Sequence, residues 1–370
     1  MLRTFSAKVT GCEKVSNGYA VTLDATAFYP EGGGQACDLG KLGDANVLDV
    51  QERGEDVVHL CDAPLEMGAI VQGEIDWERR FDLMQQHTGE HILSGVLHKL
   101  YGCQNVGFHV GADRMEVDFD GMLTQEQVDE AVRLANRAVW QDMPVKCWTP
   151  DPQELEKTVY RTKRPLPWPV RIVQVGDVDS CACCGVHTKS TGQVGLIAVF
   201  SCVKFHQGIR LEMACGERAL RYVNQIFNEN RAVSRLLSAK MPETAAAVEK
   251  LKESLAAEKY KAAALQTRLF DAIGESYRGV CRPVHFEEHL TGGAIRELAE
   301  KIAQVCQEAV VCAGSDEAGY NVCIIAQDAA HIGKGLSAAL GGRGGGKGGV
   351  FQGNVKASKQ ALLQFLRQDS

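Results

Sequence analysis

The 370-residue chain lacks the two features that would place it in or across a membrane. No run of apolar residues approaches the roughly 20 residues that a membrane-spanning helix needs. The N-terminal residues 1–9 contain no apolar core of a signal peptide. Fourteen cysteines in a chain without a secretion signal favour a reducing compartment. We therefore expect a cytoplasmic protein.

Excess positive charge is also missing. The net charge of −7 argues against indiscriminate binding of nucleic acid, but it leaves room for a local site. Residues 156–172 carry five basic residues and one acidic residue, and residues 331–370 carry six and one. Each segment is either a surface that faces phosphate groups or an ordinary solvated face.

A glycine-rich run at residues 341–349 lacks one element of a phosphate-binding loop. It has the glycine and lysine spacing of an NTPase loop, but Gly348 stands where that loop has a metal-binding Ser or Thr. The sequence therefore excludes this type of NTPase. We predict instead a flexible loop in which Arg343 and Lys347 contact an RNA backbone.

What the chain does contain is two pairs of metal-binding side chains with the same spacing. On a helix, His87 and His91 lie on one face, and Cys183 and His187 repeat the four-residue spacing about ninety residues later. Three imidazoles and one thiolate suit tetrahedral zinc. The sequence therefore predicts a zinc site formed by these four residues.

The first pair also matches the H-x-x-E-H pattern of inverted zinc peptidases, in which Glu90 would be the general base. Such an enzyme needs a downstream glutamate as its third ligand. Three are available, namely Glu116, Glu126 and Glu154. Cys183 and His187 would then have no role, so we rank the peptidase second. If all four predicted ligands hold the metal, Glu90 lies outside the ligand set and is expected to be dispensable.

The order of strand-like and helix-like segments predicts an α+β protein. Short β-branched segments in residues 1–75 predict a small N-terminal barrel. Residues 76–228 predict an α/β sandwich that holds the zinc, with a first helix capped by Asp76 and stopped by Gly102. Residues 229–279 predict a helical linker, and residues 280–370 a C-terminal α/β domain that contains the glycine-rich loop.

The linker carries a heptad-like pattern. Eight positions step alternately by three and four residues, and seven of them are apolar. They are Val248, Leu251, Leu255, Glu258, Ala262, Leu265, Leu269 and Ala272. This pattern predicts a coiled coil or a helical hairpin, with a homodimer formed through the linker and the C-terminal domain, or else one amphipathic helix packed on its own chain.

Residues 23–35, Leu-Asp-Ala-Thr-Ala-Phe-Tyr-Pro-Glu-Gly-Gly-Gly-Gln, resemble the Thr-x-Phe-Tyr…Gly-Gly-Gln signature of the editing domain of alanyl-tRNA synthetase and its free-standing relatives. The two metal motifs follow in the order and separation of that family, and the glycine-rich tail resembles its C-terminal domain. Threonyl-tRNA synthetases share the metal motifs but not the Gly-Gly-Gln segment. The resemblance covers essentially the whole chain, which looks like the long free-standing form.

The resemblance implies a zinc-dependent hydrolase that deacylates tRNA(Ala) mischarged with serine, with glycine as a second candidate. Zinc would activate water or orient the ester. Thr26, Gly33, Gly34 and Gln35 map onto the substrate-binding segment of the family. Thr26 and Gln35 are expected to hydrogen-bond the seryl group or the terminal ribose. A non-catalytic, zinc-stabilised tRNA-binding protein is the remaining alternative.

The chain departs from the family pattern beside the thiolate. The family motif reads Cys-Gly-Gly-Thr-His, whereas residues 183–187 read Cys-Cys-Gly-Val-His, so a valine replaces the threonine. Spacing makes Cys183 the expected ligand. Cys181 and Cys184 stay open as alternative thiolates, and so does a site with three protein ligands and a water molecule.

Overall fold

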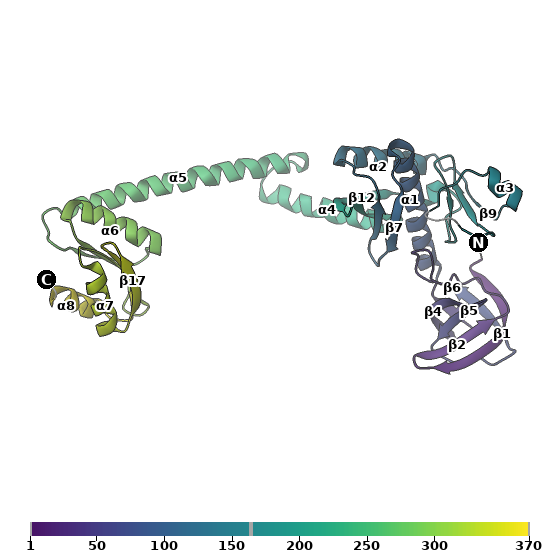
Figure 1. The fold of residues 1–370 in the computed structure, drawn as a ribbon, viewed down its shortest axis with the longest axis horizontal. Helices are drawn as coiled ribbons and strands as arrows, with labels where there is room; N and C mark the ends of the chain where they lie inside the picture. The colour runs from purple at the N-terminus through teal and green to yellow at the C-terminus, as the bar shows by residue number, and fades with distance from the viewer. Residues whose placement is uncertain (1, 163–165, 369–370) are drawn as a thin grey trace. The chain divides into compact units, whose positions relative to one another are not determined.

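The computed structural model describes residues 2–162 and 166–368, which form two compact units divided between Ala232 and Val233 (Figure 1). The fold is α+β, as predicted. The finer division at residues 75, 228 and 279 stays a prediction. No helix in the described ranges is long and apolar enough to cross a membrane. Lys163 and Arg164, part of the first basic segment, lie outside the described residues.

The first unit begins with the predicted barrel, which is closed and has six antiparallel strands in the order β1-β2-β5-β4-β3-β6. Their bounds are β1 (Thr4–Val15), β2 (Gly18–Leu23), β3 (Gly40–Leu42), β4 (Ala45–Arg53), β5 (Asp56–Cys61) and β6 (Ile70–Ile75). Alternate side chains such as Val9, Val21 and Val50 fill the interior. The long connection at residues 24–39, between β2 and β3, carries the Gly-Gly-Gln segment.

Helix α1 (Trp77–Tyr101) follows the barrel and carries both metal-binding histidines in its middle. Asp76 caps the helix by accepting a hydrogen bond from the Arg79 backbone N–H (3.1 Å), and Gly102 ends it with a φ of 71°, as predicted. All residues from 86 to 97 are buried, because helix α2 and strands of two sheets contact α1. The histidines therefore lie inside the unit.

Two antiparallel sheets complete the first unit, in the orders β12-β13-β8-β7 and β11-β10-β9. The strands are β7 (Asn105–Val110), β8 (Met115–Phe119), β9 (Val145–Trp148), β10 (Ile172–Val175), β11 (Asp179–Ala182), β12 (Ile197–Phe205) and β13 (Gly208–Cys215). The helices are α2 (Gln125–Trp140), α3 (Pro152–Lys157), the 3-10 turn η1 (Thr191–Val194) and α4 (Gly216–Leu236). Thr124 and Gln127 form a capping box at the start of α2.

The second unit opens with the last turn of α4, which is followed by a short 3-10 turn, η2 (Met241–Glu243), and the long helix α5 (Thr244–Ser276). Within the predicted linker at residues 229–279, residues 229–236 belong to α4, residues 237–243 interrupt the helix, and α5 is one continuous helix. Its heptad leucines are 53–63 % exposed: Leu251, Leu255, Leu265 and Leu269. None of these four belongs to an apolar core of the described residues, and the coiled coil stays a prediction.

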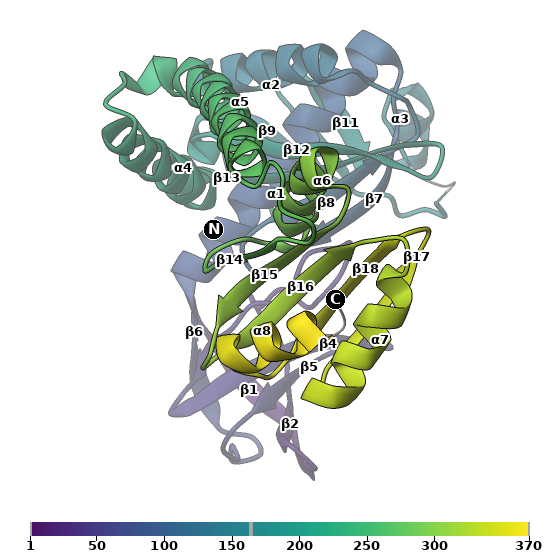
Figure 2. The ribbon, with the colours of Figure 1, turned by 90° about the vertical axis from the view of Figure 1, so that its left-hand side faces the viewer.

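The remainder of the second unit is a five-stranded sheet in the order β14-β15-β16-β18-β17, in which only β14 and β15 pair in parallel (Figure 2). Its strands are β14 (Val284–Glu287), β15 (Ala309–Ser315), β16 (Gly319–Ile325), β17 (Arg343–Lys347) and β18 (Val350–Val355). Helix α6 (Gly292–Cys306) covers one face, while α7 (Ala329–Leu340) and α8 (Lys359–Gln368) cover the other.

The prediction of a flexible glycine-rich loop is wrong, because β17 is an edge strand paired with β18. Two of the three glycines of β17 allow close packing. A Cβ at Gly344 would lie 2.4 Å from the ring of Phe351, and one at Gly346 would lie 2.3 Å from the Val350 carbonyl oxygen. Only glycine allows the buried Phe351 ring to approach this strand so closely.

Candidate metal centre and its cleft

The four predicted ligands come together in the first unit. The ligand atoms of His87, His91, Cys183 and His187 all lie within 4.8 Å of one another. Cys183 Sγ is 3.4 Å from Nε2 of His87 and 3.4 Å from Nε2 of His187. In tetrahedral zinc sites, bonds of about 2.3 Å to sulfur and 2.0 Å to nitrogen separate these two donors by about 3.5 Å. Donor types and spacing therefore fit zinc.

Each imidazole is held at Nδ1 by a different partner, which leaves its Nε2 for a metal. The pairs are His87 with Gln35 Oε1 (2.7 Å), His91 with Asp179 Oδ2 (2.9 Å) and His187 with Thr88 Oγ1 (3.2 Å). Such outer partners fix ring orientation in metal sites. The rings are therefore oriented before any ion binds.

The electrostatics favour the coordinating forms of two ligands. Burial would raise the pKa of the Cys183 thiol, but His87, His187 and His91 hold it well below its ordinary value. Burial and the neighbouring His87 lower the pKa of His187 to about 3. His91 differs, because Asp179 and Cys183 outweigh burial and raise its pKa. A metal ion would displace a proton there.

Asp179 links His91 to a basic side chain. Burial alone would raise the pKa of Asp179, but hydrogen bonds from His91 and Arg161 lower it to about 2. Arg161 donates from Nε to Oδ1 (2.7 Å) and from Nη2 to Oδ2 (2.9 Å). Asp179 therefore stays ionised and holds the His91 ring.

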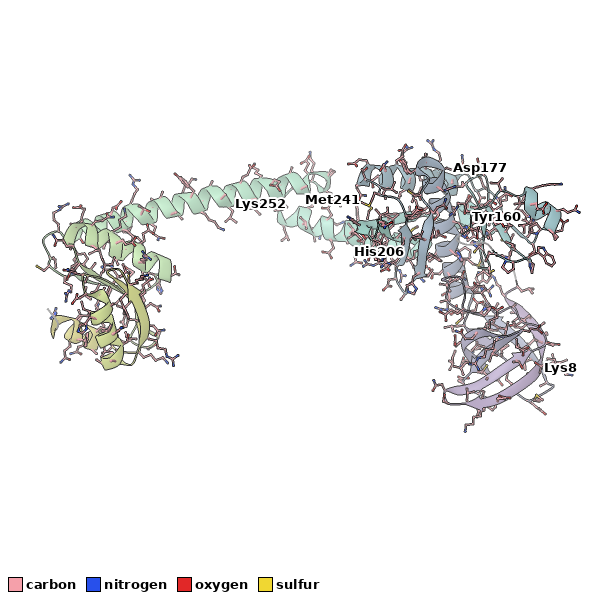
Figure 3. The ribbon with its side chains drawn as sticks, viewed as in Figure 1. Lys8, Tyr160, Asp177, His206, Met241 and Lys252 are labelled. Carbon is pink, nitrogen blue, oxygen red and sulfur yellow. The ribbon has the colours of Figure 1, made fainter. Side chains whose placement is uncertain are left out.

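We predict that Asp179→Asn lowers zinc affinity about 10- to 100-fold, because the neutral amide orients His91 less firmly. Competition with a chromogenic chelator would measure the dissociation constant. Asp177→Asn, at an exposed position labelled in Figure 3, is the matched control and should leave the affinity unchanged. Equal affinities of the two variants would contradict a role for Asp179.

The metal ligands lie against an open cleft of about 870 Å³. His87, His91 and Cys183 line it, as do Arg161 and Arg171 from the first basic segment. Arg171 Nη1 donates to the carbonyl oxygens of Cys183 (2.7 Å) and Gly185 (2.9 Å). The cleft thus combines a metal-binding cluster with two guanidinium groups.

The alternative thiolates are placed differently from Cys183. Cys184 lines the cleft and is exposed, but it is not part of the four-residue cluster. Cys181 forms a separate group with His91 and Asp179. The geometry therefore favours Cys183 as the thiolate of a site that also contains His187.

The predicted substrate-binding residues are not all at the cleft. Gly33 lines it, whereas Gly34 packs against β7, where its carbonyl oxygen accepts a hydrogen bond from Val110 N (3.3 Å). Gln35 is buried, and its Oε1 is bonded to His87. Thr26 Oγ1 is bonded within the barrel region, to His59 Nε2 (2.9 Å) and Phe28 N (3.1 Å). These oxygen contacts of Gln35 and Thr26 are internal to the protein, whereas Gln35 Nε2 has no hydrogen-bond partner within the described residues. The substrate contacts of both residues stay predictions.

The peptidase interpretation lacks its third ligand among the described residues. The available glutamates are absent from both metal-binding groups. Glu116 pairs with Arg210 (2.7 Å), Glu154 accepts a hydrogen bond from Trp148 (3.1 Å), and Glu126 is exposed on α2. The residues that join His87 and His91 in the cluster are Cys183 and His187 and not a glutamate.

Sequence reasoning missed Asp179, Arg161 and Asn105. Asp179 lies 88 positions from the histidine that it holds, so no local spacing could have indicated the pair. Asn105 lines the cleft at the start of β7 and bonds Glu90. For Glu90 the signal was present, in the H-x-x-E-H pattern.

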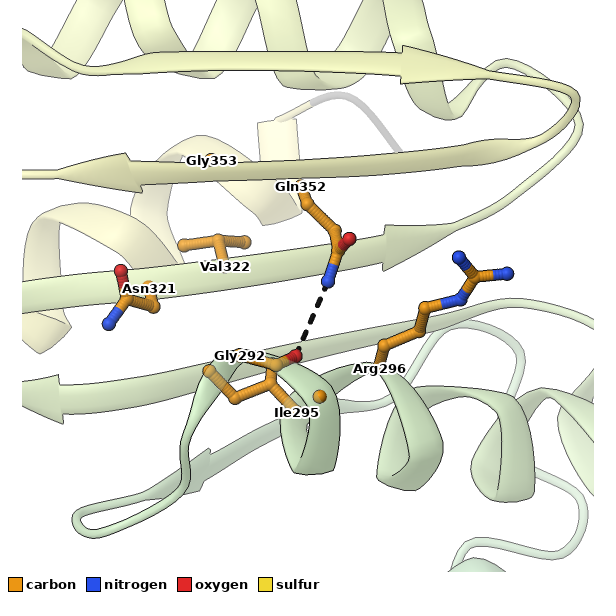
Figure 4. A pocket seen from close by; sticks show the side chains of 8 residues that line it. Gly292, Ile295, Arg296, Asn321, Val322, Gln352 and Gly353 are labelled. Carbon is orange, nitrogen blue, oxygen red and sulfur yellow. Dashed lines mark hydrogen bonds between the residues drawn. The ribbon is translucent and has the colours of Figure 1, made fainter. Parts of the chain in front are cut away.

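The second unit has a smaller cleft of about 440 Å³ beside the first turn of α6 (Figure 4). Gln352 Nε2 donates to the Gly292 carbonyl oxygen across it (3.4 Å), and Arg296 lines it. Arg343 and Lys347 are not among its lining residues but are exposed on β17. Four positions apart on a strand, they share one face.

Comparison with known proteins returns one group of relatives. The family model "tRNA synthetases class II (A)" matches residues 2–79, and "Threonyl and Alanyl tRNA synthetase second additional domain" matches residues 170–210. Alanyl-tRNA editing protein Aarsd1-A of Xenopus laevis is 30% identical, over 97% of this chain and 90% of its own length. Alanyl-tRNA editing protein AlaX-L of Pyrococcus horikoshii is 35% identical, over 62% and 59%. An alanine–tRNA ligase of Pyrobaculum neutrophilum is 32% identical, over 99% of this chain but 43% of the ligase.

Proposed function

Because the chain belongs to the alanyl-tRNA editing protein family, we propose that it is a zinc-dependent deacylase that hydrolyses tRNA(Ala) mischarged with serine. The observation that supports this most is the cluster of His87, His91, Cys183 and His187 beside an open cleft. Structural zinc sites usually take all four ligands from the protein, whereas catalytic sites leave a position for water or substrate. Three of the four ligands line the cleft, so a substrate oxygen there would reach the zinc as a fifth ligand. Access from the cleft therefore favours catalysis over a non-catalytic tRNA-binding protein.

Hydrolysis of mischarged tRNA(Ala) is needed because amino-acid selection by a synthetase has a physical limit. An alanine pocket of a synthetase cannot strongly reject an amino acid that adds a hydroxyl group or loses a methyl group, so serine and, second, glycine are the expected errors. A separate hydrolytic site can remove them after transfer to tRNA. This chain would supply such a site in trans.

The residues of the chain have distinct parts in this proposal. Bound zinc would polarise the ester carbonyl or activate water. Gln35 and Asp179 position His87 and His91 through their Nδ1 atoms. The guanidinium group of Arg171, bonded to the Cys183 backbone, would face the phosphates of the tRNA terminus.

Deacylation assays test the proposal directly. The protein is incubated with Ser-tRNA(Ala), Gly-tRNA(Ala), Ala-tRNA(Ala) and Ser-tRNA(Ser). We expect rapid loss of serine from tRNA(Ala), and slow or no loss from the last two substrates. Equal hydrolysis of Ser-tRNA(Ala) and Ala-tRNA(Ala) would contradict an editing role.

The second unit is proposed to hold the tRNA body through Arg343 and Lys347. Each phosphate contact should add about 0.7 to 0.9 to the slope of log K against log salt. We therefore expect Arg343→Ala with Lys347→Ala to weaken tRNA binding and to reduce that slope by about 1.4 to 1.8. Filter binding over a series of salt concentrations would measure both.

Lys334→Ala with Lys356→Ala is the matched control, because it removes the same charge from the same unit. The competing explanation is that the second unit only dimerises the chain through the exposed leucines of α5. In that case, the Arg343 and Lys347 variant would leave the salt slope unchanged. Leu251→Glu with Leu255→Glu would then convert a dimer into a monomer on light scattering.

A further inference from the structure

At one side of the metal cluster, the cleft presents a carboxylate with an unused oxygen. Glu90 is 5 % exposed and lines the cleft. Its Oε1 accepts hydrogen bonds from Ser94 Oγ and from Asn105 Nδ2 (2.5 Å). Its Oε2 lies 4.0 Å from His91 Nε2 and accepts no hydrogen bond from the residues that the structure describes. The carboxylate is thus fixed in place, and its second oxygen has only the long ion-pair contact with His91.

Asn105 supplies a second unused acceptor beside it. The residue is 6 % exposed and lines the same cleft, and its Oδ1 has no hydrogen-bond partner within the described part of the chain. The bond from Nδ2 to Glu90 fixes the amide, because the flipped amide would place its oxygen against the carboxylate. Buried acceptors are almost always satisfied, so this one is expected to take a donor, water or a ligand, that the described residues do not supply.

The charges along the cleft indicate how a substrate would lie. Arg171 gives the lining a positive charge, Arg161 is paired with Asp179, and Glu90 and Asn105 offer a negative charge and a neutral acceptor. An aminoacyl ester on tRNA has the opposite pattern, with an ammonium group at the amino acid and phosphates along the nucleotides. An ammonium group has three donors, and it forms its strongest hydrogen bonds with carboxylates.

We propose that Glu90 Oε2 and Asn105 Oδ1 bind the α-ammonium group of the aminoacyl ester, an inference that rests on the function proposed above. Glu90 precedes the ligand His91 on α1, so an ammonium group bound there lies beside the metal cluster. Glu90 is then a specificity-determining residue that selects aminoacyl esters over other acyl esters. This inference replaces the expectation that Glu90 is dispensable.

A pair of matched substrates tests the inference. Seryl-tRNA(Ala) is compared with glyceroyl-tRNA(Ala), in which a hydroxyl group replaces the ammonium group. Because the ammonium group also activates the ester, each kcat/KM is divided by the spontaneous hydrolysis rate. Glu90→Gln should lower this ratio about 10- to 100-fold for the seryl ester, the range for a hydrogen bond to a charged group. The glyceroyl ester should lose less than about threefold, since its neutral hydroxyl forms only a weak bond there.

Two controls separate this role from others. Glu130→Gln makes the same change at a half-exposed carboxylate of α2 outside the cleft, and zinc content and the unfolding midpoint are measured for every variant. Equal losses on both esters would overturn the inference and assign Glu90 to water or metal. No loss on either ester would overturn it as well.

Should Glu90→Gln fail to fold or lose zinc, Asn105→Ala keeps the carboxylate and decides the question. Asn105→Ala should lower the normalised kcat/KM of the seryl ester about 3- to 10-fold more than that of the glyceroyl ester. Equal losses on the two esters would overturn the inference. Activity of the wild-type protein distinguishes failure of the ammonium-site inference from failure of the proposed deacylase function. If it hydrolyses neither ester, the deacylase proposal is wrong, whereas hydrolysis without discrimination by Glu90→Gln overturns only the ammonium site.

Discussion

Cys183→Ala is expected to remove the bound zinc and to lower deacylation of Ser-tRNA(Ala) about a thousandfold. A catalytic metal stabilises transition-state charge by several kcal/mol, and each 1.4 kcal/mol corresponds to a factor of ten in rate. The same result is expected for His87→Ala combined with His91→Ala. Elemental analysis should find about one zinc per chain in the wild type and almost none in these variants.

Cys184→Ala is the matched control, because it removes a neighbouring thiol that is exposed and lies outside the four-residue cluster. It should retain zinc. Zinc lost from this variant and kept in Cys183→Ala would show that the thiolate has been assigned to the wrong cysteine. Zinc retained by the double histidine variant would contradict the metal centre as a whole.

The zinc-free protein also distinguishes a catalytic from a structural ion. The rings of His87, His91 and His187 are held by Gln35, Asp179 and Thr88, and the surrounding unit has its own apolar core. We therefore expect Cys183→Ala to remain folded by circular dichroism. An unfolded chain would favour the non-catalytic alternative, in which zinc mainly stabilises the protein.

The largest expected loss of stability follows from Asp38→Ala. Asp38 and Arg80 form a buried ion pair whose side chains are 0 % and 7 % exposed. Arg80 Nε donates to Asp38 Oδ1 (2.6 Å), and Arg80 Nη2 also donates to the Ala27 carbonyl oxygen (2.8 Å). Removing the carboxylate leaves a buried guanidinium group without its counter-charge. This should lower the free energy of unfolding by about 3–5 kcal/mol.

The same pair joins the barrel to the metal centre. Asp38 Oδ2 accepts a hydrogen bond from the Tyr29 backbone N–H (2.5 Å), so the pair ties residues 24–39 to α1. That connection delivers Gln35 to His87. We therefore expect Asp38→Ala to weaken zinc binding as well as stability.

Urea unfolding followed by circular dichroism would measure the change. Asp44→Ala, at an exposed turn position between β3 and β4, is the control and should change the free energy by less than about 0.5 kcal/mol. Asp38→Leu with Arg80→Met should recover much of the loss, because replacing a buried pair by apolar side chains avoids the unpaired charge. A loss below about 1 kcal/mol in Asp38→Ala would mean that water reaches Arg80.

Local patterns in the chain were enough to predict much of this protein. The four-residue spacing of His87 and His91, the cap at Asp76 and the stop at Gly102 depend on neighbours within a few positions. Alternating β-branched segments predicted the barrel for the same reason. Each of these signals follows from the period of one helix or strand, so it can be read without knowing what packs against it.

The tertiary structure decided what surrounds the metal ligands. The contact of Gln35 with substrate stays a prediction, but its Oε1 lies 2.7 Å from His87, 52 positions away. Thr26 is bonded to His59, and the glycine run at residues 343–347 is a strand because Phe351 packs across it. Glu90 gains its unused oxygen only because Asn105 and Ser94 hold the other one. These roles arise from contacts between elements far apart in the sequence, and no local period or residue preference specifies such contacts.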